Sequence, residues 1–202
     1  GEMKYSVWNN FLECDSIKLQ TKDSSFTFSL DSFSIGGISW MKILTQNDFN
    51  PNAFSSSTIN AEKIILSYHE SMQELSINKF HISSPDSQLT TSSLKYHYLI
   101  DDEQFFEKSK FRQTRLRLDI SQINIIGLDF MSFLKGNTYG ARKINLQDVF
   151  ADILLNKDKL GEENLSAPYM PNELLSSIKE IIKVDSLEIS NGNLKYSERF
   201  AV

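Results

Sequence analysis

The feature that most constrains the fold of this chain is an internal repeat. The segment FTFSLDSFSIGGISWMKIL, residues 26–44, aligns without gaps on LRLDISQINIIGLDFMSFL, residues 116–134, at an offset of ninety (116 minus 26). A second stretch, residues 61–66, matches residues 141–146 at an offset of eighty, which predicts about ten extra residues (90 minus 80) in a loop of the first copy. Apolar residues coincide at nine positions of the long match: Phe26/Leu116, Phe28/Leu118, Leu30/Ile120, Phe33/Ile123, Ile35/Ile125, Ile38/Leu128, Trp40/Phe130, Met41/Met131 and Leu44/Leu134.

Each copy has the same internal pattern. Apolar residues alternate with polar ones at 26, 28 and 30, and the alternation then shifts phase to 33 and 35. Alternation is typical of a strand with one buried face, and the shift predicts a bulge or bend that keeps apolar side chains on that face. The apolar runs that follow predict short helices near 39–46 and 129–136, with Ser39 and Asp129 as their capping residues.

The segment DSLEISNGNLKYSERF near the end of the chain carries a hairpin signal. Asn191-Gly192 is typical of a type I′ turn, whose two central residues need positive φ. A hairpin centred there would place Leu187 opposite Tyr196 and Ile189 opposite Leu194.

Three further elements follow from local patterns. A turn centred on Lys22-Asp23 would place Ile17 opposite Phe28, although this loop could be wider. Residues 80–89 read as another hairpin through a Ser-Pro-Asp-Ser turn. After Pro171, apolar residues at 174, 175, 178, 181 and 182 recur at helical spacing and predict a helix.

We therefore expect a mainly β (β-rich α+β) fold, in which repeated antiparallel hairpin units form a curved, groove-like or sandwich-like sheet with a few short helices. Residues 1–14 would form an N-terminal edge segment, its initial Gly being typical of a tag remnant. Residues 15–75 would form the first repeat unit and 76–168 the second. Residues 169–202 would supply a linker helix and the start of a truncated third unit.

Composition and motifs argue against several function classes. A formal net charge of −5 provides no basic field for a nucleic-acid backbone. The single cysteine, Cys14, excludes an internal disulfide. His69, His81 and His97 lack metal-ligand spacing, and the latter two are expected on polar strand faces. No phosphate-binding loop or nucleophile elbow occurs, so we expect no enzyme activity, no cofactor and no metal.

The aromatic-rich apolar strand faces allow two interpretations. They form the core of a closed sandwich, or they line an open trough that accommodates lipid acyl chains. The candidate lining residues share the alternating positions of the repeat and of the C-terminal segment: Phe26, Phe28, Leu30, Phe33, Ile35, Leu116, Leu118, Ile120, Ile123, Ile125, Leu187, Ile189, Leu194 and Tyr196.

Most of residues 15–200 resembles AsmA-like proteins, particularly large envelope proteins of Bacteroides-type bacteria. The resemblance lies in KFRQTRLRLDISQINIIGLDFMSFL, in ARKINLQDVFADILLNKDK, in MPNELLSSIKEII and most specifically in VDSLEISNGNLKYSERF. Gln147-Asp148-Val149 departs from the family pattern.

The resemblance implies a periplasmic protein anchored in the inner membrane, by an anchor absent from this sequence. It also implies a groove-shaped sheet that conducts phospholipid in outer-membrane biogenesis, and no catalytic residues. The alternative is a structural β-sheet module that binds a partner protein without lipid.

Overall fold

A computed structural model describes residues 3–45, 50–108, 110–136, 138–160 and 181–200. These residues confirm the expected β-rich fold, because they form one mixed sheet of eleven strands with three short α-helices. The strands are β1 (Met3–Ser6), β2 (Phe11–Gln20), β3 (Phe26–Gly36), β4 (Thr58–Tyr68), β5 (Gln73–Ser83), β6 (Gln88–Thr91), β7 (Ser93–Tyr98), β8 (Thr114–Ile126), β9 (Thr138–Asn156), β10 (Ile181–Ser190) and β11 (Asn193–Arg199). The helices are α1 (Trp40–Leu44), α2 (Asp102–Glu107) and α3 (Phe130–Lys135), with a 3₁₀ turn η1 at Pro51–Phe54.

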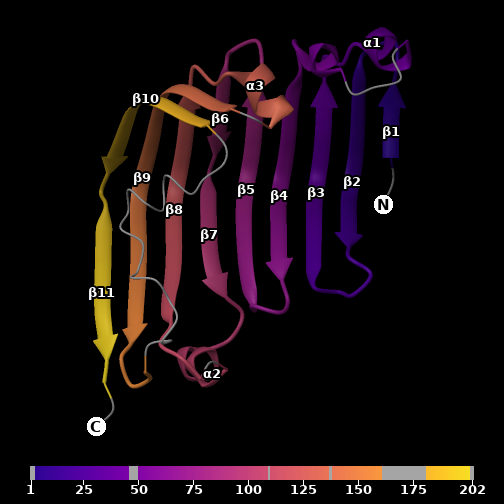
Figure 1. The fold of residues 1–202 in the computed structure, drawn as a ribbon. Helices are drawn as coiled ribbons and strands as arrows, with labels where there is room; N and C mark the ends of the chain where they lie inside the picture. The colour runs from indigo at the N-terminus through magenta and orange to yellow at the C-terminus, as the bar shows by residue number, and fades with distance from the viewer. Residues whose placement is uncertain (1–2, 46–49, 109, 137, 161–180, 201–202) are drawn as a thin grey trace.

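The strands follow one another across the sheet almost in chain order. The order is β1-β2-β3-β4-β5-β6-β8-β9-β10, with β7 continuing the line of β6 and β11 continuing the line of β10. All neighbours are antiparallel up to β9, whereas β10 and β11 run parallel to β9. Figure 1 shows a single layer of strands, with the two termini at opposite edges and α3 lying over one end of the sheet.

A line of backbone breaks crosses the sheet from β2 to the β10–β11 edge, and we call it the crease. Ser32, Lys79, Asp148 and Asn191 have φ between 48° and 56°, in the left-handed region. The regular pairing is interrupted at these residues and at the residues opposite them, for example between Cys14↔Phe33 and Ser16↔Asp31. A left-handed residue turns the following peptide over, so alternation restarts in the opposite phase. The crease therefore accounts for the phase shift between residues 30 and 33.

The hairpin expected at Asn191-Gly192 is wrong. β10 and β11 do not pair with each other: both pair in parallel with β9 at one constant offset, Ser190↔Gln147 and Asn193↔Phe150. Asn191 has the positive φ that the turn required, but it uses it at the crease, where its Nδ2 donates to Asp148 Oδ1 at 3.0 Å. The expected pairs of Leu187 with Tyr196 and of Ile189 with Leu194 are therefore absent within the chain.

The structure also corrects two registers. Ile17 lies opposite Leu30 rather than Phe28, because the loop between β2 and β3 spans five residues, 21–25, instead of a two-residue turn. The second part of the repeat is offset by 85 rather than 80: Ile59 lies opposite Ile35, and Ile144 lies opposite Ile125 (144 minus 59). The first copy therefore carries five extra residues (90 minus 85). The hairpin within residues 80–89 is confirmed by the pairing of β5 with β6.

Helices α1 and α3 confirm the two short helices of the repeat. Asp129 caps α3, accepting from Ser132 N at 3.0 Å, but the Ser39 side chain makes no capping hydrogen bond to α1. Ser39 N donates instead to Ala53 O, which ties α1 to η1. The helix expected after Pro171 lies mostly outside the described residues, and its last two positions, Ile181 and Ile182, belong to strand β10 instead.

The two glycines at the end of β3 provide a matched stability test. Gly37 has φ +71°, and a Cβ there would lie 2.2 Å from the backbone oxygen of Ser56, whereas a Cβ on Gly36 meets nothing within 4 Å. We expect Gly37→Ala to lower the free energy of unfolding by at least about 2 kcal/mol, from left-handed strain and overpacking together. Gly36→Ala is expected to be neutral or stabilising by up to about 1 kcal/mol. Urea unfolding of both variants measures this, and equal effects would contradict the strain explanation.

Candidate functional site

Apolar side chains form continuous rows across one side of the sheet. Directly paired residues project from the same side, so the register defines each row. Next to the crease on its α2 side lies the row Ile17, Leu30, Ile64, Ile77, Leu94, Ile120 and Val149. The next row is Leu19, Phe28, Leu66, Leu75, Tyr96, Leu118, Ala151 and Leu194.

The rows continue on the α3 side of the crease. A third complete row comprises Leu12, Ile35, Ile59, Ile82, Leu89, Ile125, Ile144 and Leu187. Because the crease resets the alternation, this row lies on the same side as the other two. We call this side the apolar face. It spans eight strand positions, or roughly 33 Å at about 4.8 Å between neighbouring strands.

All fourteen residues expected from the sequence lie on the apolar face. Those on β3 and β8 occupy its middle, and Leu187, Ile189, Leu194 and Tyr196 occupy its β10–β11 edge. Strands β2, β4, β5, β7 and β9 also contribute to this face and were not among the expected residues, although Ile64, Leu66, Leu94, Tyr96 and Tyr98 carry the same apolar signal.

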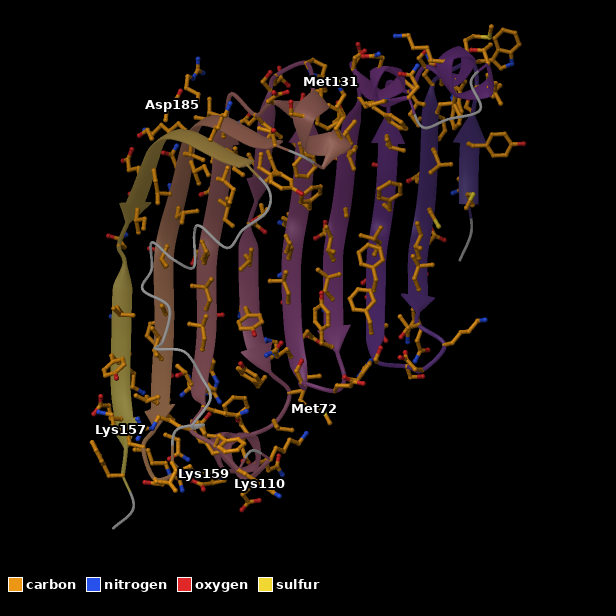
Figure 2. The ribbon with its side chains drawn as sticks, viewed as in Figure 1. Met72, Lys110, Met131, Lys157, Lys159 and Asp185 are labelled. Atoms are coloured by element: carbon orange, nitrogen blue, oxygen red, sulfur yellow. The ribbon has the colours of Figure 1, made fainter. Side chains whose placement is uncertain are left out.

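Among the described residues, the apolar face is covered at one end and exposed at the β10–β11 edge. Helix α3 covers the α3 end, where Ile82 (1% exposed), Leu89, Leu128 and Phe130 form a buried cluster against which Met131 also packs (Figure 2). At the β10–β11 edge the same face is open, since Leu187, Ile189, Leu194 and Tyr196 are between 51% and 68% exposed. The described residues therefore do not form a closed sandwich.

Aromatic rings line the open part of the face. The rings of Phe26 and Tyr68 lie 5.1 Å apart, and those of Tyr96 and Tyr98 lie 6.0 Å apart. Burial raises the pKa of Tyr96 to about 12, with a further contribution from its hydrogen bond with Tyr98. The Tyr96 phenol therefore remains uncharged at physiological pH and adds no negative charge to the face.

The opposite side of the sheet is polar. Asn60 donates to Ser34 Oγ at 3.2 Å and contacts His81 Nδ1 at 2.6 Å, and His97 lies 3.9 Å from Glu74. His81 and His97 therefore lie on the polar side, as expected from the sequence. Among the described residues, no group of three His, Cys, Asp or Glu side chains is arranged to hold a metal ion.

A charged cluster lies at the α2 end of the polar side. The guanidinium of Arg115, which is 2% exposed, lies 2.9 Å from Asp152 on β9 and 3.1 Å from Asp102 at the start of α2. Arg117 lies 2.7 Å from the same Asp102. Arg199 joins α2 to the outermost strand through Glu103 at 2.6 Å. This cluster fixes α2 and the end of β11 to the sheet, and no sequence motif indicated it.

Chemically, the apolar face offers dispersion and hydrophobic contacts over a long open surface. In the part of the chain that the structure describes, no helix is long and apolar enough to cross a membrane. Searches of protein-family models, curated proteins and solved structures find nothing that matches this chain.

Proposed function

We propose that this chain is a non-catalytic segment of a bacterial cell-envelope protein of the AsmA-like class, which binds or guides phospholipid along its apolar face. The observation that carries the proposal is the continuity of the apolar rows from β2 to β11, together with their exposure at the β10–β11 edge. Soluble monomers rarely leave an apolar surface of this extent without a binding role.

The dimensions of the face suit an acyl chain. The rows extend roughly 33 Å across the strands, which exceeds the length of a fatty acyl chain. Each methylene removed from water contributes about 0.8 kcal/mol, so partial burial of one chain already offsets much of the entropic cost of binding. The polar side would remain in water, and the lipid headgroup would project past the rim of the sheet.

Lipid binding is testable with two adjacent residues of β3. Phe28 lies on the apolar face and Ser29 on the polar side. In a fluorescence assay with delipidated protein and a phospholipid carrying a labelled acyl chain, Phe28→Glu is expected to weaken binding at least tenfold, because it places a carboxylate in the middle of the face. Ser29→Glu is the matched control and is expected to bind as the unmodified chain does.

A second variant tests lipid binding at a position where the substitution does not disturb the folded core. Leu194 is 68% exposed, so Leu194→Glu removes apolar surface without opening the core. We expect it to weaken lipid binding while the thermal unfolding curve of the dilute, monomeric chain is unchanged. Equal binding by all variants, or no phospholipid bound by the unmodified chain, would exclude a role of this face in lipid binding.

The alternative is a structural module that binds a partner protein through its sheet. The observation that favours it is the long edge formed by β10 and β11, which no strand covers among the described residues. Recovery of a stoichiometric protein partner by chain that carries no lipid would support this alternative.

A further inference from the structure

The β10–β11 edge is long, and no other strand covers it among the described residues. It pairs with β9 from Ile181 to Arg199 on its inner side, while no described strand lies on its outer side. The edge contains no proline and presents alternating apolar and polar side chains. Natural sheet edges of this length are normally shortened, charged or covered, because their free N–H and C=O groups accept another strand.

The sequence of this edge is complementary to itself. If two copies met antiparallel about Asn191-Gly192, Leu187 would lie opposite Tyr196 of the second copy and Ile189 opposite Leu194. On the polar side, Glu188 would lie opposite Lys195. Like charges would meet where Asp185 lies opposite Glu198, and Lys157 already neutralises Glu198 at 2.6 Å.

The crease also fits this pairing. In the antiparallel pairs of the sheet, each left-handed residue lies opposite a residue with ordinary φ: Ser32 is opposite Glu62, and Asp148 is opposite Ser121. In the proposed pairing, Asn191 with φ 56° would lie opposite Gly192 of the second copy, which is not a positive-φ glycine. The break would therefore continue from one copy into the other in the arrangement that the sheet already uses.

We propose that two copies of this chain pair antiparallel through their β10–β11 edges, about a two-fold axis at Asn191-Gly192. Because residues that lie opposite each other project from the same side, the two apolar faces would join into one. This inference is independent of lipid binding, since it rests on the register, the charges and the backbone of the edge.

Disulfide trapping tests this register. In a Cys14→Ser background, an Ile189→Cys chain mixed with a Leu194→Cys chain is expected to form a covalent heterodimer under mild oxidation. Opposite residues of antiparallel strands have Cα atoms about 4.5–5.5 Å apart, within disulfide range. Neither variant alone is expected to cross-link efficiently, because like positions of the two copies would lie roughly 16 Å apart.

Sedimentation of the unmodified chain supplies an independent measurement. We expect a concentration-dependent monomer–dimer equilibrium, weakened severalfold by Glu188→Lys and by Lys195→Glu and recovered in the double variant. The recovery is specific to the proposed pairing, because residues 188 and 195 do not face each other within one chain. A monomer at all concentrations, or equal cross-linking of the single variants alone, would overturn the proposal.

Discussion

Replacing Arg115 by methionine is expected to lower the free energy of unfolding by about 3–5 kcal/mol, the usual cost of breaking a buried ion pair from one side. The guanidinium contacts Asp152 at 2.9 Å, and Asp152 is itself only 6% exposed. Without Arg115, the remaining cation near Asp152 is Lys195, at 4.0 Å. For a chain of this size the loss corresponds to roughly 6–20 °C in Tm, measurable by calorimetry.

Two controls separate this effect from a general loss of surface charge. Arg117→Met removes a cation whose side chain is 37% exposed and is expected to cost less than about 1 kcal/mol. The double variant Arg115→Met/Asp152→Leu is expected to recover a substantial part of the loss, because it leaves no unpaired buried charge at Asp152. If the double variant were less stable than Arg115→Met alone, the loss would not come from an uncompensated Asp152.

Replacing Ile82 by alanine is expected to cost about 2–5 kcal/mol, as for other large-to-small changes in packed cores. Ile82 is 1% exposed and lies beneath α3, in contact with the cluster that includes Leu89, Leu128 and Phe130. The variant should also loosen α3, so hydrogen exchange of the α3 amides is expected to accelerate more than that of α2.

The same change at an exposed position is the matched control. Ile182, on β10, is 55% exposed, and Ile182→Ala is expected to change stability by less than about 1 kcal/mol. Similar costs at residues 82 and 182 would show that burial under α3 does not stabilise the sheet. Chemical denaturation with a common m-value measures both variants.

The strands and the membership of the apolar face could be predicted from the sequence, because both depend on local alternation. Phe26, Phe28 and Leu30 face one side of β3 whatever strand lies beside them, and the shift before Phe33 signals a break without neighbours. The internal repeat also predicted correctly that β3 and β8 are equivalent strands. Its second segment was misaligned by five residues, since short alternating stretches match in several registers.

Strand pairing could not be predicted at residues whose backbone preference suits two different structures. Asn191 tolerates positive φ, which a type I′ turn and a crease residue both require, and nothing local distinguishes them. Lys79 takes the same conformation without any sequence signal. The cluster around Arg115 depends on contacts among β8, β9 and α2, which only the folded sheet brings together.

The crease has a consequence for how such a protein can evolve. The two copies of the repeat differ by five residues, and the difference falls in the connection before β4, whose length the sheet does not constrain. If one residue were gained or lost within a strand, the crease residue of that strand would no longer align with the crease in the two neighbouring strands. The apolar side chains beyond that point would then project from the polar side of the sheet. Insertions are therefore expected to accumulate between strands, while a change of length inside a strand would survive only if its neighbours changed with it.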